Sequence, residues 1–355
     1  MNAGNHHLSG EQRTNAIQRL TALWAFTESG LGGIMHALHI PLTGLVVGGM
    51  AVIMISLIAF LSGGQYKQVL KSAIIVLIVK ATVSPHTPVP AYIAVSFQAL
   101  LGFALFHLLH VNFISILLLS CIAMIESAIQ KILILTLFFG KSLWIALDNM
   151  IAWLTDQFGI SVSNGSYWLI LAYLFIYLVA GFFVARVAHQ SVRYFGSNDL
   201  PLSFNAEINT AGLALQNKER KKSSYKKLWG FILLMLALSL VLFLFAKDTK
   251  NGWLAIAKTI SRTLSAIVIW FILVGPLLTK LIKKLLQKKE SRYIHEVLQT
   301  VSFLPVIQTL TALAWQQSKS RAGLQRGGFF ILLLIHTTIT YSDPALSEPL
   351  ANQPT

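Results

Sequence analysis

The chain has 355 residues, of which 55% are hydrophobic and only 12% are charged, with a formal net charge of +15. Soluble domains carry about 25% charged residues, so this composition excludes an ordinary soluble protein. The basic residues lie beside hydrophobic runs, which indicates contact with anionic lipid headgroups and argues against nucleic acid as a partner. The single cysteine, Cys121, excludes a disulfide framework and a cysteine-based metal site.

Hydrophobic stretches of about 20 residues, the length that a helix needs to cross a bilayer, recur along the chain. Because hydrocarbon offers no partners to backbone amides, each stretch must be helical. We therefore predict an all-α, polytopic transmembrane bundle with about eight or nine spans. The predicted spans are 20–38, 42–62, 68–83, 91–110, 112–139, 167–187, 229–246, 253–279 and, least clearly, 328–341.

Basic residues set the expected orientation. The segments 186–228 and 280–292 are rich in Lys and Arg, which predicts that both face the cytoplasm. Counting back six spans from residue 186 places the N-terminus in the cytoplasm, with the connection 140–166 outside. The third span carries Lys71 and Lys80 near its ends, where their long side chains are expected to reach the interface. The expected location is the inner (plasma) membrane, as a multi-pass protein.

Composition divides the chain into five parts. The C-terminal part includes a basic amphipathic helix at 281–289, expected at the membrane surface, and an apolar segment at 297–315 that fits an interfacial or re-entrant helix as well as a span. The parts are a polar tail at 1–19 without a signal peptide, a six-helix membrane domain at 20–187, a basic cytoplasmic linker at 188–228, a C-terminal membrane module at 229–341 and a polar tail at 342–355.

Ionisable residues within spans are candidate functional residues, because each is costly unless it is paired or hydrated. Glu28 and Glu126 are the two acids. Glu126 precedes Gln130 by one helical turn, so a local pair is the simpler reading. Glu28 is followed by small residues, including Ser29 and Gly33, which weaken the helix and allow close approach of a backbone or ligand.

Polar side chains near two outer loops are candidate substrate-binding residues. If these loops cover one cavity, their histidines converge on an anionic solute or a transition metal. The alternative is that they are interfacial histidines with a polar tip in water, and the sequence leaves the metal question open. Together with Glu28, the candidates are His36, His39, His86, Tyr92 and Gln98.

The chain contains no recognisable catalytic or nucleotide-binding signature, and nothing in it calls for a cofactor. We therefore expect no enzymatic activity, and a partner would supply any ATP hydrolysis. Two alternatives stay open: a membrane enzyme acting on lipid or isoprenoid substrates, and a scaffold in an envelope complex.

The first 190 residues resemble the substrate-binding S-component of energy-coupling factor importers. The resemblance lies in Leu20-Thr-Ala-Leu-Trp-Ala25, the turn His39-Ile-Pro-Leu-Thr-Gly44 and the glycine-rich second span. It implies outer loops that cap a vitamin-like molecule or a metal ion, and a first helix that packs on a partner scaffold through small residues. These partner-facing positions would be Ala22, Ala25, Ser29 and Gly33.

Residues 229–341 resemble more weakly the transmembrane T-component of the same importers, which grips its ATPase subunits through short Ala-Arg-Gly-like motifs. Arg321 and Arg326, in Ser320-Arg-Ala-Gly323 and Gln325-Arg-Gly-Gly328, would be the corresponding positions, although the order of the motif differs. The resemblance implies a solute-recognition subunit fused to a coupling module, with ATPase subunits as partners. Extra helices with a lipid-binding basic face are the alternative.

Overall fold

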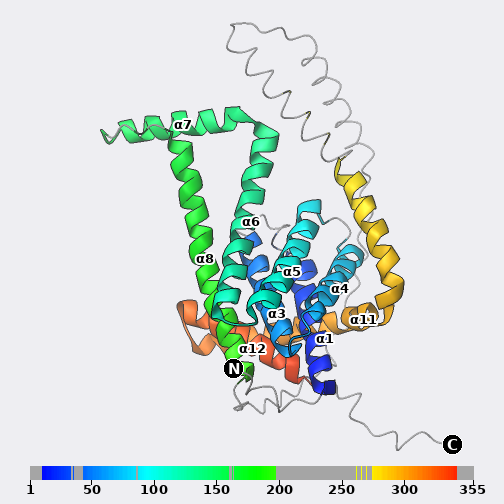
Figure 1. Cartoon of the computed structure of the whole chain (residues 1–355). Coiled ribbons are helices and arrows are strands. Elements are labelled where there is room, and N and C mark those ends of the chain that lie inside the picture. Colours follow the sequence, from blue (N-terminus) through cyan, green and yellow to red (C-terminus); the bar gives the residue numbers. More distant parts are fainter. Residues whose placement is uncertain are drawn as a thin grey trace, which may run out of the picture.

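The computed structural model describes residues 10–32, 35, 43–84, 87–159, 162, 164–196, 261, 265, 269 and 274–341. Every regular element in these residues is a helix, which confirms the predicted all-α class. The helices, shown in Figure 1, are α1 (Gly10–Phe26), η1 (Thr27–Leu31), α3 (Thr43–Leu61), α4 (Lys67–Val83), α5 (Val89–Leu109), α6 (Phe113–Phe139), α7 (Lys141–Asp156), α8 (Gly165–Gly196), α11 (Gly275–Gln317), η4 (Ser318–Ser320) and α12 (Gly323–Thr340).

Five helices in the described residues are long and apolar enough to cross a membrane: α3, α5, α6, α8 and the segment Ser291–Ser320. The predicted spans 42–62, 68–83, 91–110 and 112–139 coincide closely with α3 to α6, and 167–187 lies within the longer α8. The predicted span 229–246 lies outside the described residues, as does most of 253–279. The first helix begins at Gly10, so the second half of the expected polar tail is helical.

The central helix is α3, and 78% of its most apolar 18-residue stretch is buried inside the protein. Its residues are apolar on all faces, as expected of a helix that is surrounded by other helices. Glycines allow two neighbours to approach it closely. A Cβ atom on Gly49 would lie 3.0 Å from Val184 in α8, and a Cβ atom on Gly48 would lie 3.2 Å from the amide nitrogen of Gln98 in α5.

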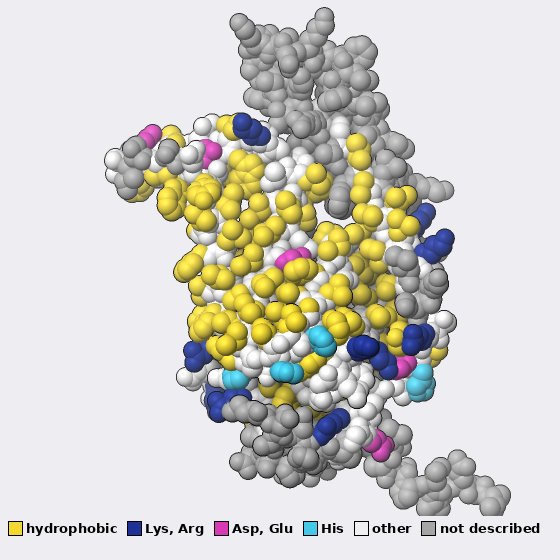
Figure 2. Space-filling model, in the orientation of Figure 1, with side chains coloured by type: hydrophobic (Ala, Val, Ile, Leu, Met, Phe, Trp, Pro, Cys, Tyr) yellow, Lys and Arg dark blue, Asp and Glu magenta, His cyan; other side chains and the backbone are white. Residues whose placement is uncertain are grey.

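One end of the bundle, which we call the basic end, carries the turns at 62–66 and 110–112. These turns meet where the hydroxyl of Tyr66 lies 3.3 Å from Nδ1 of His110. The last residue of α8, Gly196, also reaches this end and lies against Phe60. Figure 2 shows Lys, Arg and His side chains gathered along this edge of a broad hydrophobic belt.

At the opposite end, which we call the α7 end, α7 runs sideways from the end of α6 past the start of α8 (Figure 1). The chain leaves α6 through Gly140, whose φ of +64° suits glycine. The carboxylate of Asp148 then accepts a hydrogen bond from the backbone N–H of Ser166, at 2.7 Å, and so ties α7 to the start of α8. The connection 140–166 therefore contains a helix in addition to the expected loop.

The C-terminal helix α11 bends at Tyr293, whose φ of −117° and ψ of 17° are not helical. Its first half, which contains the predicted amphipathic segment 281–289, runs steeply at one side of the bundle, whereas its second half crosses the basic end together with α12 (Figure 1). Ser291–Ser320 has the composition of a span, but in the structure it covers the end of the bundle and packs against α1.

Candidate functional site

A buried ion pair joins η1, which follows the first helix, to α4. Nζ of Lys80 in α4 lies 2.5 Å from Oε2 of Glu28 in η1, and both side chains are at most 5% exposed. Two ions removed from water are stable only when they are paired with good geometry. Lys80 was expected to reach the interface, and this expectation is wrong because its ammonium group is held inside the bundle by Glu28.

The segment that carries Glu28 is a turn of π-helix, Thr27–Leu31. Its sequence, Thr-Glu-Ser-Gly-Leu, combines weak helix formers with a glycine, which lets the backbone depart from regular α-helix. Thr27, Glu28 and Ser29 are all buried in succession. Single π-turns inside helices are frequent at functional sites, and here the turn presents the carboxylate of Glu28 to α4.

One buried polar atom without a partner in the described part of the chain belongs to Ser29, next to Glu28, and another belongs to Gln98 on α5. Among the described residues, neither Oγ of Ser29 nor Oε1 of Gln98 has a hydrogen-bond partner. Gly32, directly after η1, lies against Val47 of α3, and the next residue of α3, Gly48, lies against Gln98 of α5. The end of η1 and the helix α5 therefore both pack against this part of α3. The bundle therefore contains a buried charged pair and, on η1 and α5, buried polar atoms that lack a partner among the described residues.

Tyr92 is also buried, at 2% exposure. Its hydroxyl lies beside Thr87 but makes no hydrogen bond of normal geometry in the described part of the chain. Tyr92 and Gln98, both on α5, are thus buried like Glu28, and we call these three residues together the buried polar zone. The histidines His36, His39 and His86 lie outside the described residues, as does Gly33.

Glu126 occupies a separate position on α6. One of its carboxylate oxygens accepts a hydrogen bond from Nε2 of Gln130, which confirms the local pair expected from their spacing. The same amide nitrogen lies 3.5 Å from the carbonyl oxygen of Pro90 at the start of α5. The described residues contain no group of three or more His, Cys, Asp or Glu that could hold a metal ion.

The proposed partner-facing positions of the first helix are covered by the chain itself. Ala22, Ala25 and Ser29 are at most 7% exposed, and α1 packs against α3, α4, α11 and α12. Of these neighbours, α11 and α12 belong to the C-terminal module. Arg321 and Arg326 stack on aromatic rings of that module, 4.6 Å from the ring centroid of Phe329 and 4.2 Å from that of Trp315, respectively.

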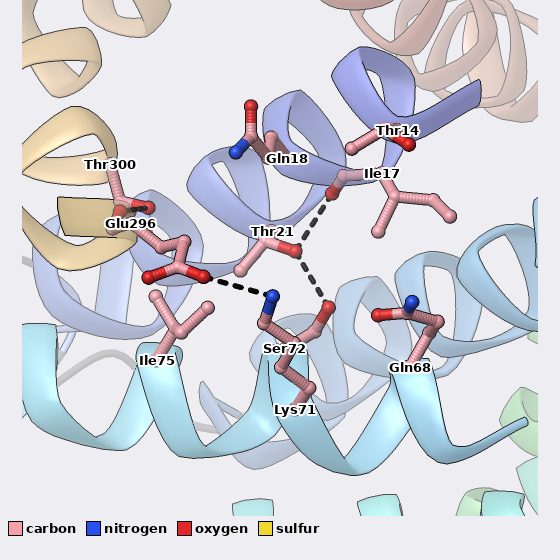
Figure 3. Close-up of a pocket in the computed structure, with 10 residues that line it drawn as sticks. All are labelled: Thr14, Ile17, Gln18, Thr21, Gln68, Lys71, Ser72, Ile75, Glu296 and Thr300. Atoms are coloured by element: carbon pink, nitrogen blue, oxygen red, sulfur yellow. Dashed lines mark hydrogen bonds and ion pairs between the residues drawn. The ribbon is translucent and has the colours of Figure 1, made fainter. Parts of the chain in front are cut away.

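A second polar region, which the sequence did not reveal, lies where α11 meets α1 and α4 (Figure 3). A small cavity of about 70 Å³ is lined by residues of all three helices. Nζ of Lys71 lies 2.9 Å from Oε1 of Glu296, and Oγ1 of Thr21 donates to Oγ of Ser72 at 2.8 Å. This seam joins the N-terminal bundle to the C-terminal module by polar contacts.

The signal for the Lys80–Glu28 ion pair was present in the sequence but incomplete. A lysine in an apolar stretch requires an acidic partner; Glu28 lies in the first predicted span, and Lys80 lies in the third. Their pairing depends on the tertiary contact between α4 and η1. Glu296 gave no signal because it lies in a segment with many charges.

Comparison of the chain with protein-family models, curated proteins and solved structures gives no match.

Proposed function

We propose that this protein is the solute-recognition membrane subunit of an importer of the energy-coupling factor type, with its N-terminus and basic end in the cytoplasm. The solute, a vitamin-like small molecule or a metal ion, binds in the α7-side half of the bundle. The observation that supports this proposal most strongly is the buried Glu28–Lys80 ion pair, together with buried atoms of the adjacent Ser29 and of Gln98 on α5 that have no hydrogen-bond partner among the described residues. Polar groups buried in a membrane bundle are costly to keep and characteristic of solute pathways.

The orientation is supported by the distribution of charge. Lys67, Lys71, Arg193 and Arg292 belong to helices or helix ends at the basic end, and cytoplasmic segments of membrane proteins carry such an excess. The α7 end then faces outward. A solute from outside would enter at this end, next to the expected outer loops.

The C-terminal module supports a coupling role. In the importers that the sequence resembles, the first helix of the S-component packs on a separate scaffold, and here α1 packs against α11 and α12 of the same chain. We propose that these helices take the place of that scaffold. The seam around Lys71 and Glu296, where α11 meets α1 and α4, would transmit the action of ATPase subunits to the bundle.

The test of solute recognition starts from the intact chain purified in mild detergent from its native cells. Native mass spectrometry should detect a retained small molecule, and thermal-shift assays with single water-soluble vitamins and single transition-metal ions should identify a stabilising solute. Ser29→Ala and Gln98→Ala should weaken its binding. Ser191→Ala is the matched control, because Ser191 is also fully buried but bonds to its own helix near the basic end.

Two results would overturn the proposal. One is a protein that retains no solute and responds to none of the compounds; the other is equal binding by the Ser29, Gln98 and Ser191 variants. Proteins that copurify with the chain provide an independent test, because ATPase subunits are expected, whereas biosynthetic enzymes would favour a role in lipid or envelope metabolism. The purified chain alone is expected to show no ATP hydrolysis.

A further inference from the structure

A groove of about 710 Å³ opens at the basic end, away from the buried polar zone. It is formed by the turn at 62–66, by α4 and α5, and by the bend of α11. The bend at Tyr293 is essential to its shape, because it brings Arg292 and Tyr293 of the C-terminal module against the first turns of α4. The volume is within the range of sites for small organic ligands.

The charged side chains that line the groove are all basic, and Gln65, Tyr66 and Gln68 add neutral polar groups. Lys67, Lys71, His107 and Arg292 line it. Lys71 is bound to Glu296, but no carboxylate among the described residues forms an ion pair with Lys67 or Arg292. Both of these side chains are exposed, so the groove presents two uncompensated positive charges that are suited to an anion.

The remaining lining is apolar and continues into the hydrophobic belt. Leu70, Ile74 and Phe103 form part of the wall. On α5, Leu100 and Ile93 follow Phe103 at helical spacing towards the middle of the belt, and they are 58% and 54% exposed. A ligand that fits this surface has an anionic head at the basic end and a hydrocarbon tail along α5.

We propose that this groove binds an anionic phospholipid, with its phosphate between Lys67 and Arg292 and an acyl chain along the Phe103 face of α5. The position agrees with this ligand, because the basic side chains lie at the edge of the hydrophobic belt where headgroups lie (Figure 2). Phosphate forms strong charge-assisted hydrogen bonds with Arg and Lys, and basic pockets between membrane helices recognise anionic headgroups.

The bound lipid joins the two parts of the chain. Lys67 belongs to α4 in the N-terminal bundle, and Arg292 belongs to α11 in the C-terminal module. A phosphate between them neutralises two like charges and holds the bend of α11 against α4. Anionic lipid therefore stabilises the contact between the bundle and the module.

The experiment uses the full chain in detergent, titrated with phosphatidylglycerol, with phosphatidylcholine of the same acyl chains, and with inorganic phosphate. Binding is read by native mass spectrometry and by the melting temperature. We expect phosphatidylglycerol to bind and stabilise the protein more than the other two. Lys67→Gln and Arg292→Gln should each weaken its binding about fivefold, the effect of one basic residue at a membrane surface, and should leave phosphatidylcholine binding unchanged.

Lys141→Gln is the matched control, because Lys141 is an exposed lysine at the start of α7, at the opposite end of the bundle. It should retain the affinity of the unmodified chain for phosphatidylglycerol. Equal binding of the two lipids would overturn the proposal, as would an equal loss in all three variants. Stabilisation by inorganic phosphate equal to that by phosphatidylglycerol would show an anion site without lipid recognition and would also overturn it. Melting temperatures in detergent without lipid establish that each variant is folded.

Discussion

Lys80 and Glu28, which are 52 residues apart in the sequence, form an ion pair in which Nζ and Oε2 are separated by 2.5 Å. Neither side chain reaches the surface. The pair joins the π-helical turn of the first membrane segment to the last turns of α4. It fixes the geometry of the region in which we place the solute, so changes to it should affect both stability and binding.

Removal of either charge alone should strongly destabilise the protein. In Glu28→Gln or Lys80→Met the remaining ion stays buried without its counter-ion, which typically costs about 3–5 kcal/mol. Thermal unfolding in detergent measures this loss. The double variant Glu28→Gln/Lys80→Met buries no charge and should be more stable than either single variant. Single variants that unfold like the original chain would contradict the buried pair.

The ion pair between Lys71 and Glu296 should contribute much less. Its side chains are 40% and 22% exposed, and exposed pairs contribute about 0.2–1 kcal/mol. Glu296→Lys should increase hydrogen exchange in the second half of α11, because it sets two positive charges side by side. Restoration of protection by the exchanged pair Lys71→Glu/Glu296→Lys would verify the contact. Equal protection in all three proteins would contradict it.

Close contact between α6 and α8 depends on Gly181. A Cβ atom there would lie 3.1 Å from the Cα of Cys121, and the carbonyl of Gly181 accepts a hydrogen bond from Ser120 at 2.7 Å. Gly181→Leu should separate the helices and cost about 1–3 kcal/mol, measured as a lower melting temperature. Gly327→Ala is the control, because a Cβ atom at Gly327 meets nothing within 4 Å. An equal effect of both substitutions would refute the close contact.

The junction of α7 and α8 should weaken in acid. The hydrogen bond from the backbone N–H of Ser166 lowers the pKa of Asp148 below its ordinary value of 3.8. A carboxyl group with a lowered pKa stabilises the folded state above its unfolded pKa, and this contribution is lost as pH falls through the lower, folded pKa. Amide exchange at Ser166, corrected for its intrinsic pH dependence, should therefore increase below about pH 4. Asp148→Asn should remove this pH dependence.

The helix α7 should lie in the membrane interface. None of its residues is buried by the protein, and Met150, Trp153 and Leu154 are each more than half exposed. Such amphipathic helices lie about 5–10 Å into the boundary of headgroups and acyl chains. Lipids brominated near the headgroup should quench the fluorescence of Trp153, identified by its loss in Trp153→Phe, more than lipids brominated at the chain end. Stronger quenching from the chain end would place α7 elsewhere.

Hydrophobic length and turn residues in the sequence determined the helical class and the positions of α3 to α6, because hydrocarbon forces the backbone into helices wherever apolar residues continue for about 20 positions. The local pair of Glu126 and Gln130 was equally predictable, since residues four apart share a helix face. The length of an apolar stretch did not determine whether its helix runs along the bundle or across the end of it. Ser291–Ser320 has the composition of a span but lies across the basic end, where its apolar residues Val297, Ile307 and Leu310 are buried within the protein.

Pairing between distant segments was decided by the tertiary structure alone. Lys80 has the same local sequence whether its side chain extends to water or turns inward, and only the contact of α4 with the π-helical turn selects Glu28 as its partner. Likewise, the groove of Lys67 and Arg292 exists because α11 bends at Tyr293. Hydrophobicity acts on each segment separately, whereas ion pairs and grooves depend on which segments become neighbours.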